Sequence, residues 1–212
     1  MSQHISENTH KLAVFDFDGT ITRRDSFNDL IIWKFGLLRF LIRMFSLTPL
    51  IILYKLGLVD NAVPKCKMFK SFFKGMKEED FIDLCQTYSL TRIDFLVREQ
   101  TRELIKRHKE KGHILIIVSA SLESWIYPWA KENSFEEVIG SKPEIANGSL
   151  TGNFQGENCY GIEKINRLQQ LYPKRSGYYI YAYGDSKGDR ELINYADQGY
   201  YISRKLFLRN EL

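Results

Sequence analysis

Three short apolar segments constrain the fold of this chain most strongly. Residues 12–15, 114–118 and 178–183 are continuously apolar or aromatic and do not alternate with polar residues. Such segments are typical of strands buried on both faces, as in a parallel sheet covered by helices on both sides. The sequence therefore predicts an α/β protein with a doubly wound parallel sheet.

Helical patterns lie between these segments. Residues 95–111 are charged and amphipathic and are followed by Gly112, a residue that commonly ends helices. Residues 163–171 form a second helical pattern, which Pro173 stops. Residues 147–161 are rich in Gly, Asn and Ser and predict a hairpin or loop that returns to the core.

Residues 26–94 interrupt this alternation. They are rich in Leu, Ile, Phe and Lys and contain no clear strand pattern, so we interpret them as an inserted helical cap. A chain of 212 residues is long enough for one core with such an inserted unit. The expected domains are a core made of residues 1–25 and 95–212, and a cap made of residues 26–94.

Small and polar residues follow each predicted strand, at 16–20, 119–121 and 184–189. In open α/β sheets, ligands bind beyond the carboxyl ends of the strands. We therefore expect these three turns to meet in one crevice.

Asp16 and Asp18 follow the first strand. Residues two apart in a strand face the same way, so both carboxylates can face the crevice. A divalent cation beside Asp16 would keep it ionised as a nucleophile, while Asp18, away from the metal, would serve as general acid and base. The alternative is an ordinary surface turn, since Asp and Gly are common turn residues.

The other two turns supply further groups for phosphate chemistry. Ser119 offers a hydroxyl and neighbouring N–H groups to phosphate oxygens, although such a serine is often only a helix cap. Asp185 and Asp189 add the hard oxygen ligands that magnesium prefers, although Asp185 is also a candidate helix N-cap. Lys164 would neutralise charge at the phosphoryl group, although a lone lysine on a helix is usually solvated.

These segments, in this order, resemble the four motifs of the haloacid dehalogenase superfamily of phosphatases. The matching segments are residues 14–20, residues 118–121, Lys164 and residues 184–189. Residues 150–164 further resemble subfamily IB, which includes phosphoserine phosphatases and some bacterial phosphatidylglycerophosphatases of the C type. The resemblance implies a Rossmann-like core, a C1-type helical cap between the first two motifs, and Mg²⁺ as cofactor.

The resemblance also implies a role for each matching residue. Asp16 would be the nucleophile and Asp18 the acid and base. The phosphate contacts would be Thr20, Ser119, Ala120 and Lys164. The magnesium ligands would be Asp16, the Phe17 carbonyl and Asp185, with Asp189 holding a metal-bound water or orienting Asp185.

The identity of the substrate is less constrained. Arg23, Arg24 and Asp25 lie near the place where the family recognises the leaving group, but they are equally readable as solvent-facing charges. Phosphoserine phosphatases usually have two glycines after the second-motif serine, and this chain has Ala120 and Ser121 there. We therefore expect a phosphomonoester, with a lipid phosphate such as phosphatidylglycerophosphate as one candidate, and phosphoserine or another small phosphorylated metabolite as the alternative.

The cap pattern permits two interpretations. In a helix starting near Gly36, Leu37, Leu41 and Met44 share one side, and the other side carries Arg39 and Arg43. This pattern fits a surface that rests on anionic lipid, and it also fits a cap with its own core or a dimer face. We favour packing over lipid contact, and the oligomeric state stays open.

Composition limits the partners and the compartment. A net charge of +4 favours anionic partners only mildly and gives no reason to expect nucleic acid. Three cysteines without a CxxC pair indicate a reducing compartment, and the polar residues 1–10 lack a secretory signal pattern. The uncharged stretch 44–54 is too short for a simple membrane span. We expect a cytoplasmic enzyme, peripheral at the inner face of the membrane if the cap binds lipid. A membrane- or protein-binding module on a degenerate phosphatase scaffold is the competing class.

Overall fold

The sheet has six strands in the order β4-β3-β2-β1-β5-β6. The computed structural model describes residues 10–59 and 62–202. The strand β1 (His10–Phe15) lies between β2 (Ile114–Leu122) and β5 (Tyr178–Gly184), parallel to both. The edge strand β6 (Gln198–Tyr201) continues the parallel order beyond β5. The three strands expected from sequence thus form the centre of the sheet, and the α/β fold class is confirmed.

One edge of the sheet is antiparallel. The strand β3 (Glu137–Ala146) runs parallel to β2, and β4 (Ser149–Gln155) returns antiparallel to β3. Asn147 and Gly148 join them with φ values of 51° and 69°. A two-residue turn with positive φ at both positions links antiparallel strands, so the hairpin alternative for this segment is correct and the sheet is mixed.

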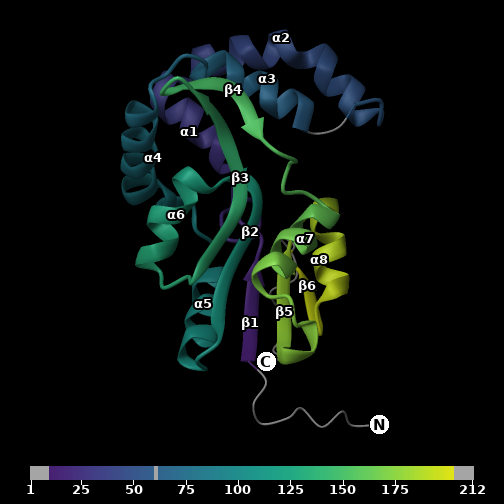
Figure 1. Cartoon of the computed structure of the whole chain (residues 1–212). Helices are drawn as coiled ribbons and strands as arrows, with labels where there is room; N and C mark the ends of the chain where they lie inside the picture. Colours follow the sequence, from purple (N-terminus) through teal and green to yellow (C-terminus); the bar gives the residue numbers. More distant parts are fainter. Residues whose placement is uncertain (1–9, 60–61, 203–212) are drawn as a thin grey trace.

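Helices cover both faces of the sheet (Figure 1). On one side lie α5 (Glu99–Glu110) and α6 (Glu123–Glu132), and on the other α7 (Ile162–Leu171) and α8 (Arg190–Tyr195). Two separate hydrophobic clusters fill the two sides, and alternate residues of β1 contribute to each. Three short 3₁₀ helices complete the described elements: η1 (Ile93–Leu96), η2 (Arg175–Gly177) and η3 (Lys187–Asp189). Because η1 precedes it, α5 begins four residues later than predicted.

Four helices lie above the carboxyl end of the sheet (Figure 1). They are α1 (Ser26–Phe35), α2 (Leu37–Lys55), α3 (Ala62–Phe73) and α4 (Glu78–Arg92). Their apolar side chains, such as Phe27, Phe69 and Phe81, belong to the same hydrophobic cluster as Trp125 and Trp129 of α6. The cap helices and this side of the core therefore share one continuous interior.

The β3–β4 hairpin is hydrogen-bonded to the cap. The N–H of Gly75 donates to the carbonyl of Leu150 at 2.8 Å, and the N–H of Leu150 donates to the carbonyl of Met76 at 2.9 Å. The N–H of Glu78 donates to the carbonyl of Gly148 at 3.0 Å. These bonds attach the segment between α3 and α4 to the edge of the core sheet.

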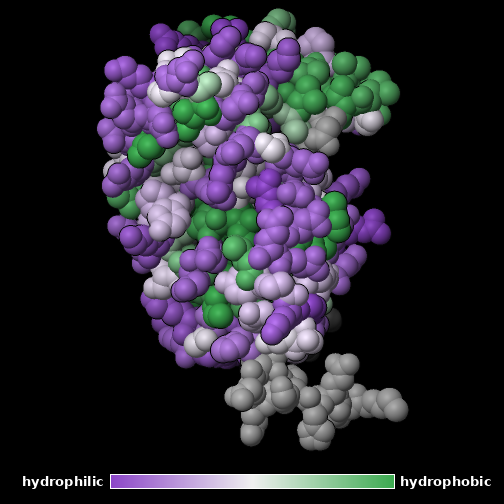
Figure 2. Space-filling model, viewed as in Figure 1, coloured by the Kyte–Doolittle hydropathy of each residue, from purple (hydrophilic) through white to green (hydrophobic). Residues whose placement is uncertain are grey.

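The helix α2 has no buried residue. Phe40, Met44 and Leu47 pack partly against the hydrophobic cluster below, whereas Leu37 and Leu41 are 55% and 51% exposed. Of the side predicted through Leu37, Leu41 and Met44, only Met44 lies against the cluster, so the packed side is rotated away from Leu37 and Leu41. Figure 2 shows apolar surface gathered over this end of the molecule.

Among the described residues, α2 is the one helix long and apolar enough to cross a membrane, by length and composition alone. Its mean hydropathy is 1.7 and none of that window is buried. The length expected from the uncharged stretch 44–54 was too short, because the helix begins at Leu37 and includes Arg39 and Arg43.

Candidate active site

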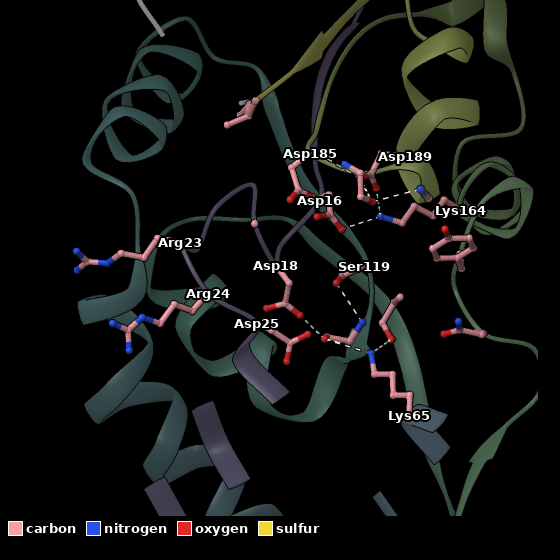
Figure 3. A pocket seen from close by; sticks show the side chains of 18 of the residues that line it. Asp16, Asp18, Arg23, Arg24, Asp25, Lys65, Ser119, Lys164, Asp185 and Asp189 are labelled. Carbon is pink, nitrogen blue, oxygen red and sulfur yellow. Dashed lines mark hydrogen bonds and ion pairs between the residues drawn. The ribbon is translucent and has the colours of Figure 1, made fainter. Parts of the chain in front are cut away.

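A cleft of about 720 Å³ opens at the carboxyl ends of β1, β2 and β5 (Figure 3). Most of the residues that line it are charged or polar, and Ala120, Tyr160 and Ile202 are among the others. The three predicted turns do meet here: the lining includes Asp16, Asp18, Ser119, Ala120, Asp185 and Asp189.

Lys164 joins two carboxylates at the base of the cleft. Its Nζ lies 2.7 Å from Asp16 Oδ1 and 2.5 Å from Asp189 Oδ1, and all three side chains are buried. Burial raises the pKa of Asp16 to about 7, although the Lys164 ammonium opposes that shift; Asp189 and Asp18 add to it. Burial opposes the charge of Lys164, but the two carboxylates raise its pKa above the ordinary value. One cation thus faces an excess of negative charge.

Asp185 adds a third carboxylate to this group. Oxygens of Asp16, Asp185 and Asp189 lie within 4.8 Å of one another. Partial burial raises the pKa of Asp185 to about 6, and the charge of Asp189 adds to the shift. Hard oxygen ligands with uncompensated negative charge fit a small divalent cation such as Mg²⁺.

Gly19 allows Asp185 to lie this close to the first motif. Its φ is +87°, and a Cβ at this position would overlap the Asp185 carboxylate. A residue with a side chain would meet both a backbone and a steric penalty here.

Asp18 is held by groups from two other elements. Its Oδ1 accepts the N–H of Ser26, the first residue of α1, at 2.7 Å. Its Oδ2 accepts a short hydrogen bond from the hydroxyl of Ser121. The carboxylate therefore lies between the start of α1 and the end of β2.

The second motif is a distorted strand, where the sequence predicted a turn. β2 continues to Leu122, and its pairing with β3 shifts register between Val118 and Leu122. Within this irregularity the N–H of Ser121 donates to the Ser119 hydroxyl at 3.1 Å. A bulge of this kind re-aims side chains, which brings Ser119 and Ala120 to the cleft.

Two predicted residues do not reach the cleft lining. The Thr20 hydroxyl is fully buried and donates to Asp16 Oδ2 at 3.2 Å, so it supports the carboxylate and does not face a phosphate. The Phe17 carbonyl accepts the N–H groups of Ile21 and Thr22, both at 2.9 Å. The turn therefore uses this carbonyl, and its assignment as a metal ligand stays a prediction.

In the fourth motif, the structure overturns only the alternative interpretation of Asp185. Asp185 is not a helix N-cap: Ser186 caps η3, and Asp189 completes the capping box. Asp189 Oδ2 accepts the N–H groups of Asp185 and Ser186 at 3.2 and 3.0 Å. Asp189 is therefore buried and fixed, whereas Asp185 is exposed to the cleft.

The three residues predicted for the leaving group, Arg23, Arg24 and Asp25, all line the cleft. The Arg23 guanidinium also donates to the carbonyl of Phe95. Asp25 is the N-cap of α1, since its carboxylate accepts the N–H of Asn28 at 2.7 Å.

Several lining residues were missed by sequence reasoning. Lys65 of α3 donates from Nζ to the carbonyl of Ala120 at 2.8 Å, and Arg98 donates from Nε to the carbonyl of Gly19 at 3.0 Å. Lys65 lies in a run of lysines with no distinguishing spacing, so nothing in the sequence separated it from its solvated neighbours. Ser121 carried one signal, its place beside the second-motif serine.

Comparisons with known proteins place this chain among proteins of one family. Protein CicA of Caulobacter vibrioides is 30% identical over 195 residues, covering 91% of this chain and 86% of that protein. A phosphoserine phosphatase of Archaeoglobus fulgidus is 28% identical over 118 residues, covering 53% of this chain and 33% of that protein. The solved structure of a phospho-aspartyl intermediate analogue of phosphoserine phosphatase has a TM-score of 0.58 at 18% identity, covering 89% and 84% of the two chains. A family model for haloacid dehalogenase-like hydrolases matches residues 13–194, and the chain belongs to that family, among its phosphatases of the phosphoserine-phosphatase-like kind.

Proposed function

We propose that this phosphatase hydrolyses a phosphomonoester through a covalent acyl phosphate (phospho-aspartate) on Asp16, with Mg²⁺ as cofactor. The observation that carries the proposal is the convergence of Asp16, Lys164, Asp185 and Asp189 at the base of a polar cleft that also contains Asp18. The fold shared with a phospho-aspartyl analogue of phosphoserine phosphatase supports it.

In the first step, a carboxylate oxygen of Asp16 attacks phosphorus, and the bond from phosphorus to the leaving alcohol oxygen breaks. Asp18 donates its proton to that oxygen, so the alcohol leaves neutral. In the second step, Asp18 takes a proton from water as it attacks phosphorus, and the bond between phosphorus and the Asp16 oxygen breaks. Inorganic phosphate and a free Asp16 carboxylate result.

The surrounding residues prepare Asp16 for this role. Lys164 and the Thr20 hydroxyl contact different oxygens of the Asp16 carboxylate, which fixes its orientation. Mg²⁺, bound by Asp16 and Asp185 beside Asp189, would offset the charge of the phosphoryl oxygens and keep Asp16 ionised. Ser119 and Ala120 line the same cleft and would supply hydrogen-bond donors to a phosphoryl group.

The direct test is phosphate release by the purified protein from a panel of phosphomonoesters, with Mg²⁺ and with a chelator. We expect Mg²⁺-dependent release by the wild type, and a loss of at least about a thousandfold for Asp16→Asn. Equal turnover by the two proteins, or turnover unaffected by the chelator, would refute this mechanism.

We further propose a lipid phosphate as substrate, with the enzyme on the cytoplasmic face of a membrane and the helices of residues 26–94 as the substrate-selecting unit. The exposed apolar residues of α2 support this, since they would be buried in the acyl region of a membrane. Arg39 and Arg43 on the same helix would be attracted to anionic head groups. The polar cleft suits a phosphorylated head group, with the acyl chains left in the bilayer.

A small charged metabolite such as phosphoserine is the second candidate. The observation that favours it is the mixture of charges at the cleft, where Arg23, Arg24 and Asp25 would meet a polar leaving group. Comparing kcat/KM for phosphatidylglycerophosphate in mixed micelles with that for phosphoserine separates the two candidates.

A further inference from the structure

The two oxygens of Asp18 are held by different kinds of group. The N–H of Ser26 bonds Oδ1 at 2.7 Å, and this contact is fixed by the backbone at the start of α1. The hydroxyl of Ser121 bonds Oδ2, and this contact depends on a single side chain.

No other described side chain offers Asp18 a comparable bond. Thr22 Oγ1 lies 3.5 Å from Asp18 Oδ1, but it donates at 2.6 Å to the carbonyl of Arg24. A hydroxyl carries only one proton, so the Thr22 proton is used by the Arg24 carbonyl. Ser121 is therefore the side chain that sets the rotation of the Asp18 carboxyl.

The direction of the Ser121 hydroxyl is itself set from the cap. Lys65 Nζ lies 3.4 Å from Ser121 Oγ and 2.8 Å from the carbonyl of Ala120 (Figure 3 labels Lys65 and Asp18). An ammonium group only donates, so Ser121 Oγ accepts from Lys65 and turns its proton towards Asp18. Ser121 is 1% exposed, so protein groups surround most of its side chain.

We propose that Ser121 is a positioning residue for Asp18, the acid and base, and that Lys65 of the cap orients the Ser121 hydroxyl. The proposal rests on the proposed role of Asp18. The contact between Lys65 of α3 and Ser121 of β2 connects the cap to the acid. Through it, the position of the cap determines the direction in which Asp18 presents its proton. The second-motif segment thus holds a phosphate-side serine, Ser119, and an acid-side serine, Ser121.

The leaving group provides a readout that a purely structural role would not give. An alkyl phosphate needs its leaving oxygen protonated, whereas p-nitrophenolate leaves without a proton. The ratio kcat/KM covers only the steps up to release of the alcohol, so the later hydrolysis of the acyl phosphate on Asp16 does not mask the difference.

The experiment compares kcat/KM for an alkyl phosphate, glycerol phosphate, with that for p-nitrophenyl phosphate. For Ser121→Ala we expect a loss of about 10- to 100-fold on glycerol phosphate and less than about 3-fold on p-nitrophenyl phosphate. Lys65→Met should shift the same ratio in the same direction by a smaller factor. It keeps the proposal testable if Ser121→Ala does not fold.

Ser141→Ala is the matched control. Ser141 is also 1% exposed and donates to the same Ala120 carbonyl at 3.0 Å, but it does not contact Asp18. It should affect both substrates equally. An equal loss on both substrates for Ser121→Ala, or no loss on either, would overturn the positioning role. Failure of the proposed function looks different, because Asp16→Asn would then retain turnover on both substrates.

Discussion

Lys164 Nζ and Asp16 Oδ1 lie 2.7 Å apart at a point where both side chains are almost fully buried. The ammonium also contacts Asp189, so one positive charge serves two carboxylates. Removing it would leave two buried negative charges without compensation, which costs about 3 to 5 kcal/mol for a buried pair.

We therefore expect Lys164→Met to lower the free energy of unfolding by about 3 kcal/mol and to reduce kcat/KM by at least about a hundredfold. Urea unfolding and phosphate release measure the two effects. Lys174→Met, at an exposed lysine outside the cleft, should change neither. A Lys164 variant as stable as the Lys174 variant would contradict the ion-pair interpretation.

Gly19 and Gly112 form a matched pair for testing the approach of Asp185. Both have positive φ, 87° and 69°, but a Cβ at Gly19 overlaps the Asp185 carboxylate, whereas a Cβ at Gly112 meets nothing within 4 Å. Gly112→Ala should cost about 1 kcal/mol of stability and leave activity unchanged. Gly19→Ala should lower stability by more than Gly112→Ala does. It should also raise the Mg²⁺ concentration needed for half-maximal activity at least about tenfold. Equal behaviour of the two variants would show that the overlap is relieved without moving Asp185.

His108 predicts how stability depends on pH. Its Nε2 lies 2.8 Å from the Tyr183 hydroxyl, and its Nδ1 lies 2.6 Å from Nδ1 of His113. Burial lowers the pKa of His108 to about 4, and the charges of His113 and Lys111 add to the shift. The unfolded chain therefore binds more protons than the folded chain between about pH 4 and 6.5, so stability falls as pH is lowered through that window.

We expect about 2 kcal/mol of unfolding free energy to be lost from this group between pH 7 and pH 5. His108→Gln keeps a hydrogen-bonding side chain but cannot take up the proton. Its stability should fall less steeply over the same range, although its packing lowers stability at pH 7. Urea unfolding at a series of pH values gives both slopes, and parallel slopes would rule out His108 as the source.

The proposed membrane contact predicts vesicle binding through α2. Ile42 and Phe45 are 58% and 84% exposed, and burying two such side chains contributes about 3 kcal/mol or more. Ile42→Ser combined with Phe45→Ser should weaken sedimentation with phosphatidylglycerol vesicles at least about tenfold, with phosphatase activity on p-nitrophenyl phosphate unchanged. Ile82→Ser combined with Leu171→Ser, at two exposed positions outside α2, is the matched control. Equal binding by the two double variants would exclude α2 as the contact.

The central part of the fold and most of the site were predictable because they depend on local patterns. Buried parallel strands are recognisable as continuous apolar segments, and the residues after them, such as Asp16 and Asp185, follow from the strand ends. The antiparallel strand β4 depends on the conformation of a two-residue turn, which the composition of that segment left open between hairpin and loop. The packed side of α2 was predicted correctly only at Met44, because an exposed helix with apolar residues on several sides gives no single packed side.

Contacts between distant segments were not predictable from spacing. Lys65 is 55 residues from Ala120, and its contact depends on how α3 lies over β2. The Phe17 carbonyl was assigned by resemblance alone, and the turn that occupies it became visible only in the structure. Ser121 drew notice as a departure from the family pattern, but its partner Asp18 lies 103 residues away.

The three main-chain hydrogen bonds between residues 75–78 and the β3–β4 hairpin affect how easily the cap can move away from the cleft. A rigid-body rotation of the cap away from the sheet would break all three bonds. It would also separate Phe69 from Phe154, whose ring centroids lie 5.1 Å apart. Each bond contributes about 1 kcal/mol, and the lost aromatic contact adds to the barrier. Moving the cap away from the sheet therefore costs at least about 3 kcal/mol in hydrogen bonds alone, so the position of the cap over the cleft is favoured by contacts that lie outside the cleft itself.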